Sequence, residues 1–372
     1  MSNNIPTLPP DWKGPIDIGR YVSGLGPTGV PLYLRRPDPT AYLYYNINDF
    51  NGGMKDDGAG TITGSANAYI SKPPDIWEHF VRFAIGAGQP ASDYASSGFG
   101  SFTQAVTDLD ALTDNVTAGA KWSHFVSILA PITPWKLAED LCTQAPMTFW
   151  RSMLDSQFKC AVYSEAPAAA NYFLDPYGNN YKWSYFEDML KDSISVGFTP
   201  LDECVSEVRV EFDYYAPTGQ YKKIAFVGPG NSDNGNGTRD QNSVAPENRE
   251  AHAASVRDDC GRSNPLIVQC PHIVQYEQAL KLRNYLFDRF FRPRLLLQFD
   301  TWSRASTVEP NMATLVSNDL TDYLPCPKYP IYSAPVNWDD MIFFVNSLSM
   351  RHTNQGDVWT MLLEEIPVDI SN

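Results

Sequence analysis

Residues 205–215 alternate between apolar and charged side chains, and this alternation constrains the fold more than any other feature of the sequence. Apolar side chains occupy every second position, at Val208, Val210 and Phe212, with charged side chains between them. Successive side chains of a β-strand point to opposite faces, so this segment predicts a strand with one buried face. A turn and a second apolar run at 221–227 follow, which together predict a two-stranded hairpin.

Other segments of the chain also have strand character. The region from Ile18 to Ile70 is β-like, with strand runs at 30–34, 41–47 and 61–63 separated by Gly-rich turns. Further short β-elements are predicted at 153–163, 266–268, 295–299, 341–348 and 358–363. Tyr and Phe raise the aromatic content to 13%, which favours strands and ordered loops over helical bundles.

In four places the spacing of apolar residues matches the period of an α-helix. Predicted helices begin after Ser71-Lys-Pro-Pro-Asp75, run from Ser101 to Leu112, open at Thr133-Pro134, and span residues 273–291. Thr133 suits the N-cap position, and Pro134 suits the first helical residue because its missing N–H needs no partner there. We therefore predict an α+β, β-rich fold.

The composition divides the chain into four parts. Residues 1–16 are Pro-rich and predict an extended N-terminal arm, followed by a first β-segment over 17–70. Residues 71–200 predict an α/β insert domain, and 201–372 a second β-domain that contains the 273–291 helix. Gly, Asn, Ser and Asp dominate residues 228–260, which predicts a long loop that is flexible unless a partner orders it.

The charge balance argues against a duplex-binding protein. The net charge is −15 and the pI is about 4.7, whereas a duplex binder needs a basic face to neutralise phosphates. The densest basic stretch, Arg283 to Arg294, is interpreted as charge on a helix face and at its end. An acidic channel wall would instead repel DNA and let it pass without binding.

The sequence has no run of 18 apolar residues, and Met1 to Pro10 lacks the blocks of a signal peptide. The six cysteines are scattered, without a C-x-x-C pair, at Cys142, Cys160, Cys204, Cys260, Cys270 and Cys326. This spacing favours reduced, buried thiols in a cytoplasmic protein, with a Cys260–Cys270 disulfide and metal-cluster ligation as alternatives. No membrane span and no cofactor are expected.

No motif in the sequence specifies a catalytic centre. Gly24-Leu-Gly-Pro-Thr-Gly29 matches G-x-G-x-x-G by letters, but Pro27 and a following strand predict a turn. Asn231 to Gly237 lacks the spaced carboxylates of a calcium loop. The adjacent acids Asp339-Asp340 and Glu364-Glu365 are interpreted as solvated or interface charge. The five histidines, at 79, 124, 252, 272 and 352, are interpreted as structural or surface residues, so no catalytic, cofactor or metal residue is assigned.

The order of these elements resembles the hub, or tail-tip, proteins of tailed bacteriophages. A β-segment precedes the helix start at Ser71–Trp77, and an α/β insert follows. A strand pair then ends in Asp213-Tyr-Tyr215, and a polar linker leads to a strand and to the helix with the Ala279-Leu-Lys-Leu-Arg283 pattern. A closing strand ends in Leu363-Glu-Glu-Ile-Pro367. The resemblance covers about residues 60–367, and a Pro-rich stretch at 301–332 departs from it.

This resemblance implies a virion structural protein without enzymatic activity, in which two barrel-like β-domains flank the α/β insert. It also implies a baseplate-hub homotrimer, because three chains with two barrels each would match the six-fold tail tube. The implied partners are the tail tube or distal tail protein and fibre or tip proteins. DNA would transit the lumen during ejection, after assembly of the tail in the host cytoplasm.

Two other functions are compatible with the sequence. One is a phage receptor-binding or carbohydrate-binding tail component, because Trp rings can stack on sugars. The Trp residues that could serve are Trp122, Trp135, Trp150, Trp183, Trp302, Trp338 and Trp359. The other is a hydrolase whose carboxylates come together only in space.

Overall fold

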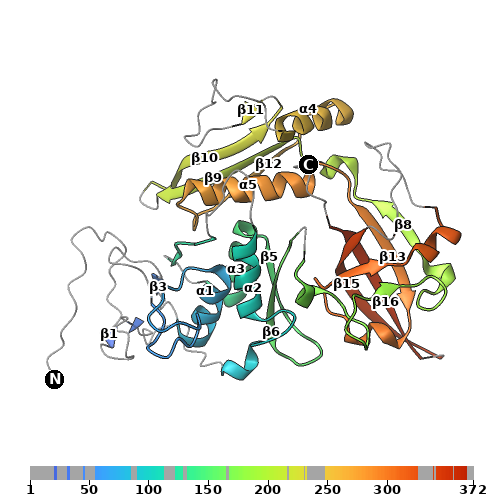
Figure 1. The fold of residues 1–372 in the computed structure, drawn as a ribbon. Helices are drawn as coiled ribbons and strands as arrows, with labels where there is room; N and C mark the ends of the chain where they lie inside the picture. Colours follow the sequence, from blue (N-terminus) through green and yellow to red (C-terminus); the bar gives the residue numbers. More distant parts are fainter. Residues whose placement is uncertain are drawn as a thin grey trace.

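The computed structural model arranges the chain in three lobes (Figure 1). It describes residues 55–84, 90–112, 122–128, 132–164, 167–215, 218–229, 231–232, 248–325, 338, 341–354 and 356–366, with the short strands at 21–22, 32–33 and 45–46. The predicted N-terminal arm (1–16), Gly24–Gly29, Cys326 and Asp339-Asp340 lie outside these residues. The described part is a mixed α/β structure with β-rich sheets, as the sequence predicts.

The helical lobe contains three helices and a β-hairpin. Its elements are α1 (Pro73–His79), α2 (Phe102–Ala111), α3 (Pro134–Gln144), β5 (Met147–Arg151) and β6 (Phe158–Val162). The predicted helix starts are confirmed: the Ser101 side chain accepts from Gln104 N–H, and the Thr133 side chain accepts from Lys136 N–H. Each cap satisfies a backbone donor that the first helical turn leaves free.

Trp77 of α1 forms the centre of the core of this lobe. Its ring stacks on Phe149 at 4.9 Å and meets Phe158 edge-on at 5.4 Å, and its indole N–H donates to Pro134 O at 2.8 Å. Offset and edge-on aromatic pairs contribute about 0.5–1.5 kcal/mol each beyond the apolar area they bury. Trp77 therefore joins α1, the start of α3 and the β5–β6 hairpin in one packed unit.

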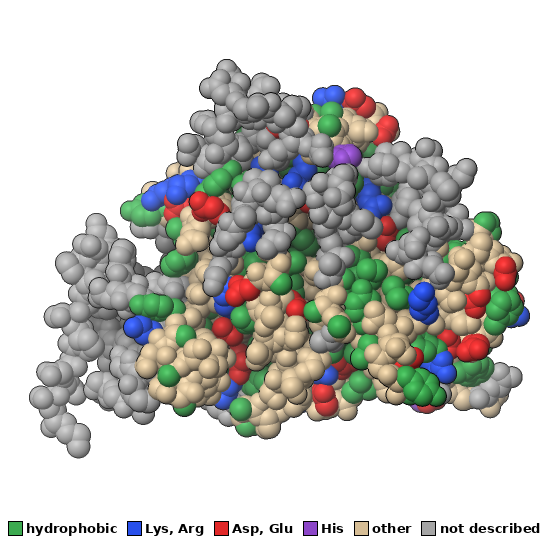
Figure 2. Space-filling view, in the orientation of Figure 1, with side chains coloured by type: hydrophobic (Ala, Val, Ile, Leu, Met, Phe, Trp, Pro, Cys, Tyr) green, Lys and Arg blue, Asp and Glu red, His purple; other side chains and the backbone are tan. Residues whose placement is uncertain are grey.

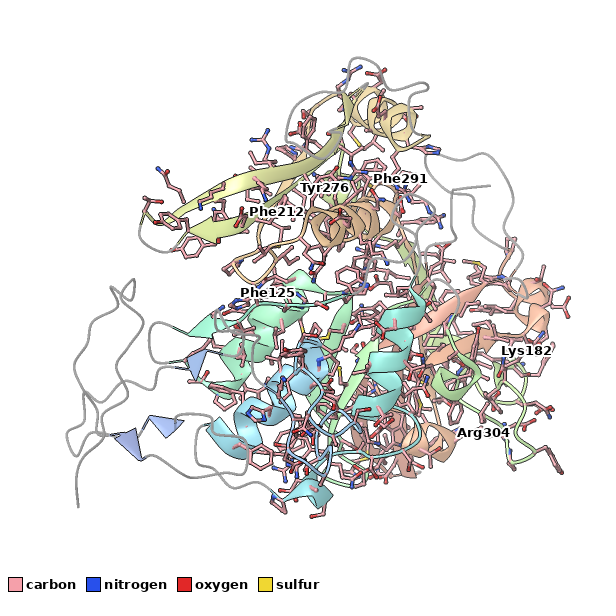
Figure 3. The ribbon with its side chains drawn as sticks, turned by 60° about the vertical axis from the view of Figure 1, so that its left-hand side comes forward. Phe125, Lys182, Phe212, Tyr276, Phe291 and Arg304 are labelled. Atoms are coloured by element: carbon pink, nitrogen blue, oxygen red, sulfur yellow. The ribbon has the colours of Figure 1, made fainter. Side chains whose placement is uncertain are left out.

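The four-stranded lobe is an open sheet with two helices. Its elements are β9 (Glu207–Tyr215), β10 (Gln220–Gly228), β11 (Asn231–Ser232), β12 (Pro265–Gln269), α4 (Asn248–Cys260) and α5 (Tyr276–Phe290). The strand order is β11-β10-β9-β12, with β12 parallel to β9. The alternation in β9 is confirmed, because Val208, Val210 and Phe212 are fully buried. Phe212 packs toward Tyr276 of α5 (Figure 3).

The prediction of one long loop over 228–260 is wrong at its C-terminal end, where residues 248–260 form α4. Ala251, Ala253 and Ala254 are strong helix formers, and Ala253 is fully buried. The Arg249 guanidinium also binds the Asp288 carboxylate of α5, with both N–O distances below 3 Å. Packing against α5 thus makes this segment helical, although its average composition predicts a loop.

The six-stranded lobe is a half-barrel sheet of order β7-β14-β15-β16-β13-β8. Its strands are β7 (Lys182–Trp183), β8 (Ser195–Phe198), β13 (Leu295–Thr301), β14 (Ala313–Val316), β15 (Ile342–Thr353) and β16 (Gly356–Glu365). The predicted hairpin at the C-terminal end is confirmed as β15–β16, with a register shift between Val345 and Ser347. The Pro-rich stretch contributes β14.

Two features of this lobe differ from the expected division of the chain. The strands β7 and β8 precede residue 200, yet β14 pairs with β7 and β13 pairs with β8. The sheet therefore takes its edges from the predicted insert. The two larger sheets of the described residues are one half-barrel and one open sheet, so the pair of barrels around the insert stays a prediction.

The N-terminal β-segment is described only in part. The strands β2 (Leu32–Tyr33) and β3 (Tyr45–Asn46) fall within predicted runs, and β1 (Tyr21–Val22) pairs with β2. The predicted strand at 61–63 is wrong, because these residues lie in turns. Asp56, which is buried, and Asp57 accept the backbone N–H groups of this segment and hold it in tight turns instead of a ladder.

The hydrophobic side chains form two main cores. One is continuous through the helical and four-stranded lobes, from Trp77 to Phe212 and Phe287. The other fills the half-barrel around Trp183, Phe299 and Phe343. The first two lobes therefore share an apolar interior, whereas the six-stranded lobe has its own.

Asp75, in the first turn of α1, is a buried acid among these helices. Burial raises its pKa from 3.8 to about 8, and the neighbouring Glu78 carboxyl adds to the rise. Because the folded state holds this proton more tightly than the unfolded chain, the free energy of unfolding falls as the pH rises from about 4 to about 8.

We predict that Asp75→Asn removes this fall, because the amide cannot ionise. The difference in melting temperature between variant and wild type, measured by circular dichroism, should grow in favour of the variant from about pH 5 to about pH 8 and then level off. The exposed Asp192, replaced by Asn, is the control. Parallel pH curves for Asp75→Asn and wild type would contradict the prediction.

Candidate functional site

The residues that the sequence offers for chemistry do not converge on one centre in the described structure. His352 is exposed beside Asp357, His252 packs against Phe291, and His79 lies beside Phe83. Only His124 and His272 come close together, and both are buried. Several buried polar groups gather instead at three junctions between the lobes, which are therefore taken as the candidate functional sites.

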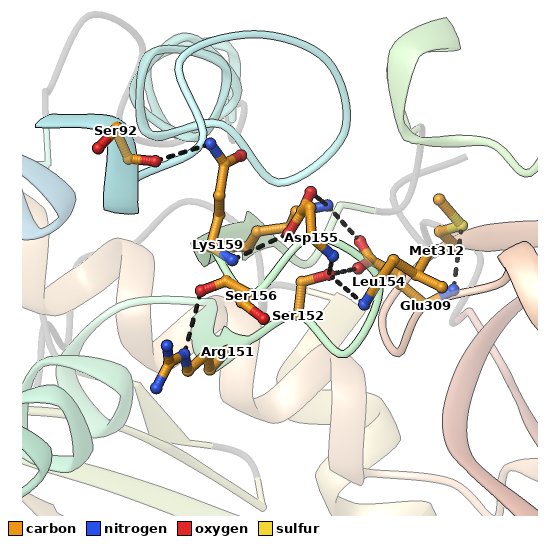
Figure 4. A network of polar contacts seen from close by, with 10 residues as sticks. Ser92, Arg151, Ser152, Leu154, Asp155, Ser156, Lys159, Glu309 and Met312 are labelled. Atoms are coloured by element: carbon orange, nitrogen blue, oxygen red, sulfur yellow. Dashed lines mark hydrogen bonds and ion pairs between the residues drawn. The ribbon is translucent and has the colours of Figure 1, made fainter.

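The first junction joins the helical lobe to the six-stranded lobe (Figure 4). Glu309, which is 3% exposed, comes from the segment before β14. Its carboxylate accepts from Lys159 Nζ of β6 at 2.8 Å and from the Ser152 hydroxyl beyond β5. Nearby, the Tyr163 hydroxyl donates to Asn311 Oδ1 at 2.9 Å. A buried charge on one lobe thus meets its counter-charge on the other.

Lys159 is held in its charged form at this junction. Burial acts to lower its pKa, but hydrogen bonds and charge from the Glu309 and Asp155 carboxylates outweigh burial, so its pKa is raised. Asp155 Oδ2 lies 3.0 Å from Lys159 Nζ. The two carboxylates thus favour the protonated amine, which has no lone pair to accept a proton.

Ser152 beside Lys159 has the residue types of a Ser–Lys pair, but its hydroxyl is occupied. It donates to Glu309 and accepts the backbone N–H of Leu154 at 3.1 Å and of Asp155 at 3.4 Å. A nucleophilic serine needs a neighbouring base to take its proton, and the Glu309 carboxylate that accepts it here is neutralised by the Lys159 ammonium. The arrangement here stabilises a turn and fixes two lobes.

The second junction joins the four-stranded lobe to the six-stranded lobe. Glu364 of β16 accepts from Arg289 of α5 at 3.4 Å, from Arg294, and from Asn346 Nδ2 at 2.6 Å. Glu365 accepts from Arg292 at 3.1 Å and from the Leu295 backbone N–H, also at 3.1 Å.

This second junction bears on two interpretations of the sequence. The Glu364-Glu365 pair is buried between two lobes rather than solvated, and Arg289 in the last turn of α5, with Arg292 and Arg294 beyond its end, neutralises it. As neighbours in a strand, the two carboxylates bind separate sets of donors, so they form no dyad. Sequence reasoning missed these pairs because they join residues about 70 positions apart.

The third junction joins the helical lobe to the four-stranded lobe. Gln144, the last residue of α3, accepts from the His272 backbone N–H at 2.9 Å through its side chain, and its backbone oxygen lies 3.2 Å from His124 Nε2. The Phe125 N–H donates to His272 O at 2.8 Å, and Phe125 lies where these lobes meet (Figure 3).

Burial favours the neutral form of the two histidines at this junction. Burial lowers the pKa of His124 to about 3, with a further contribution from His272, and burial lowers the pKa of His272 to about 4. An imidazole that stays neutral under these conditions acts as a packed polar ring rather than as a proton carrier near neutral pH.

One further polar cluster lies within the six-stranded lobe. Asp188 accepts from the Tyr181 hydroxyl at 2.7 Å, from the Ser184 N–H at 2.9 Å and from Arg304 at 3.0 Å. Burial raises its pKa to about 6. These contacts hold the segment between β7 and β8 against the sheet.

Within the part of the chain that the structure describes, no three His, Cys, Asp or Glu side chains are grouped closely enough to hold a metal ion. No described helix combines the length and hydropathy that crossing a membrane requires. Among the tryptophans considered for sugar stacking, Trp122, Trp183 and Trp338 are fully buried, whereas Trp135 and Trp302 are exposed.

The surface shown in Figure 2 carries acidic and basic side chains interspersed among neutral ones. Basic side chains on this face do not gather into a continuous stripe over the described residues. The arginines of the second junction explain part of this pattern, because Arg294 is buried and Arg289 and Arg292 are only partly exposed.

No protein-family model and no curated protein matches this chain. Among solved structures, it is similar to the 43 kDa tail protein of prophage MuSo2 from Shewanella oneidensis, with a TM-score of 0.36 and 13% identity over 68% of this chain and 59% of that one. It is also similar to a tail protein from Neisseria meningitidis MC58, with a TM-score of 0.36 and 10% identity over 68% and 61% of the two chains.

A third similar structure is a chain in the virion of a native gene transfer agent particle. The TM-score is 0.37 and the identity is 8%, over 73% of this chain and 47% of that one. The chain thus spans about half to three fifths of the length of these structures. Overlap at this level does not assign a fold.

We predict that the Lys159–Glu309 pair is coupled across the first junction. Glu309→Gln should lower the free energy of unfolding by about 2–4 kcal/mol in urea titrations, because the buried Lys159 ammonium loses the negative charge that Glu309 supplies. Lys159→Met should have a similar effect. The double variant should lose less than the two single losses combined, by about 1–3 kcal/mol.

The exposed Lys136–Glu139 pair of α3 supplies the matched control, with Lys136 Nζ to Glu139 Oε2 at 3.3 Å. Glu139→Gln should change stability by about 0.5 kcal/mol or less. If the double variant lost as much stability as the two single variants combined, the Lys159–Glu309 contact would not couple the lobes.

Proposed function

We propose that this chain is a structural component of a bacteriophage tail and acts there as the hub that closes the tail tube. The observation that carries the proposal is the order of the elements along the chain. The helix start at Pro73, the β9–β10 hairpin with Tyr214-Tyr215 at its turn, the β12–α5 unit and the closing strand β16 follow one another in the order on which the resemblance to tail hub proteins rests.

The three junctions fit a part that must keep its shape under load. Each junction places a buried polar or charged group of one lobe against a partner on another, as in Glu309 with Lys159 and Glu364 with Arg289. Relative movement of the lobes would separate these groups and leave charges unpaired in the interior, which costs several kcal/mol. A rigid subunit transmits force between the tube and the tip.

The proposed assembly is a homotrimer in the virion tail. Two β-modules per chain would give six around the axis, and six modules match a six-fold tube. The tail tube or distal tail protein would bind on one side, and fibre or tip proteins on the other. The net charge of −15 would let DNA pass through the lumen without specific binding.

A receptor-binding or carbohydrate-binding tail component is the second candidate, and one observation favours it. The six-stranded lobe exposes Tyr177 (90%), Phe186 (60%) and Trp302 (38%), and exposed rings of this kind can stack on sugars. The hydrolase alternative gains no support from the buried carboxylates at the junctions, because Glu309, Glu364 and Glu365 are each paired with a cation.

We predict that the purified protein is a trimer, with three times the chain mass of 41.6 kDa by light scattering coupled to size exclusion. It should also bind the tail-tube protein encoded in the same genome. Tyr177→Ala and Trp302→Ala should leave both properties intact, because the proposal places neither residue in the ring.

A stable monomer that does not bind tube protein would contradict the hub. If that monomer bound glycans, and Trp302→Ala abolished the binding, the second candidate would be correct instead. Hydrolysis of the glycan by the same monomer would point to the third.

A further inference from the structure

Two cysteines from distant parts of the chain contact the same backbone oxygen. Cys204 follows a short 3-10 turn at Leu201–Glu203, and Cys260 is the last residue of α4. The Cys204 N–H donates to Leu201 O at 3.1 Å, and Cys260 Sγ lies 3.6 Å from that oxygen. Cys260 Sγ and the Cys204 amide nitrogen can therefore be no further apart than these two distances combined.

Asn264 fixes the backbone on both sides of this contact. Its side-chain amide donates to Asp202 O at 2.8 Å and to Cys204 O at 2.9 Å, and its own N–H donates to Ser206 Oγ at 2.8 Å. Gly261, with φ of +66°, turns the chain from α4 toward Asn264 without a steric penalty. These hydrogen bonds hold the end of α4 beside the backbone at Cys204, and the Cys260 thiol lies close enough to raise the pKa of the Cys204 thiol.

The remaining described thiols lack this arrangement. Cys270, the alternative partner of Cys260 in the sequence, is fully buried, and its N–H is bound to Glu211 O at 2.8 Å in the strand register. Cys142 and Cys160 are also near each other, and Cys160 is 1% exposed, about as buried as Cys204 at 2%. Cys142 is also partly exposed, but Cys260 is distinguished by the contact of its Sγ with Leu201 O, the oxygen that also accepts the Cys204 N–H.

We propose that Cys204 and Cys260 form a redox-active pair that closes into a disulfide when the protein leaves a reducing environment. The bond would attach the end of α4 to the segment that leads into β9. It would also close a covalent loop around the β9–β10 hairpin. This inference does not rest on the proposed tail function.

The chemistry balances with a small-molecule disulfide, such as oxidised glutathione, as the oxidant. The Cys260 thiolate attacks one sulfur of the oxidant, forms a mixed disulfide and releases one glutathione thiolate. The Cys204 thiolate then attacks the Cys260 sulfur, forms the Cys204–Cys260 bond and releases the second glutathione thiolate. The two protein thiols lose two protons and two electrons, and the oxidant is reduced to two thiols.

The buried partner should set the rate. Burial raises the pKa of Cys204 to about 11, and the neighbouring Cys260 thiol adds to the rise. Only the thiolate attacks, so the thiolate fraction of Cys204 rises about tenfold per pH unit between pH 7 and pH 10. The mixed disulfide at Cys260 should therefore be detectable at neutral pH and short-lived at pH 9.

The experiment uses the full chain, first reduced and then incubated with oxidised glutathione at pH 7, 8 and 9. Free thiols are alkylated, and proteolytic peptides are mapped by mass spectrometry. We expect a linked Cys204–Cys260 peptide pair whose rate of formation rises with pH. The link should disappear in Cys204→Ser and Cys260→Ser and persist in the matched control Cys270→Ser.

Thermal unfolding gives a second readout on the same samples. The oxidised protein should melt about 5 °C above the reduced one, because the cross-link restricts the unfolded chain, and a reductant should reverse the shift. Both serine variants should melt at one temperature with or without oxidant. Because the wild-type peptide map carries the main result, a variant that fails to fold leaves the test intact.

Three outcomes would overturn the proposal. Cys260 could be recovered fully alkylated after prolonged oxidation at pH 9. It could stop at the glutathione adduct at every pH, which would show that Cys204 cannot reach it. It could link to Cys270 or Cys326 instead of Cys204.

Discussion

Charged side chains buried between lobes must find partners across the junction, and this constraint fixes the arrangement of the whole molecule. An unpaired charge in a protein interior costs several kcal/mol, so a lobe that carries Glu309 or Glu364 inward is stable only where another lobe supplies a cation. Lys159 and Arg289 supply it here. These pairs add little net stability over apolar contacts, but they specify one relative orientation.

The two cores explain why such specification is needed. The helical and four-stranded lobes share a continuous apolar interior, whereas the half-barrel packs around its own cluster. Apolar contact is non-directional, so two separate cores could meet in several ways. The directional contacts of Glu309, Glu364 and Glu365 select among them. A structural part of an assembly needs this kind of fixed shape more than it needs chemistry.

The sequence predicts which helices and strands form better than it predicts which of them contact one another. The α5 helix, the β9–β10 hairpin and the capped start of α3 follow from periodicity and capping, which are local properties. The α4 helix is missed because its alanines stand at the end of a polar stretch, and its stability depends on the Arg249–Asp288 contact with α5. The buried state of Glu364 and Glu365 is equally invisible, since their arginine partners lie about 70 residues away.

Calorimetry of the intact chain tests the central claim most directly. If the three junctions make one rigid body, unfolding of the whole chain should appear as a single transition whose calorimetric and van't Hoff enthalpies agree. The double substitution of Glu364 and Glu365 by Gln should split that transition, with the half-barrel unfolding separately. Two resolved transitions in the wild-type protein would contradict the account.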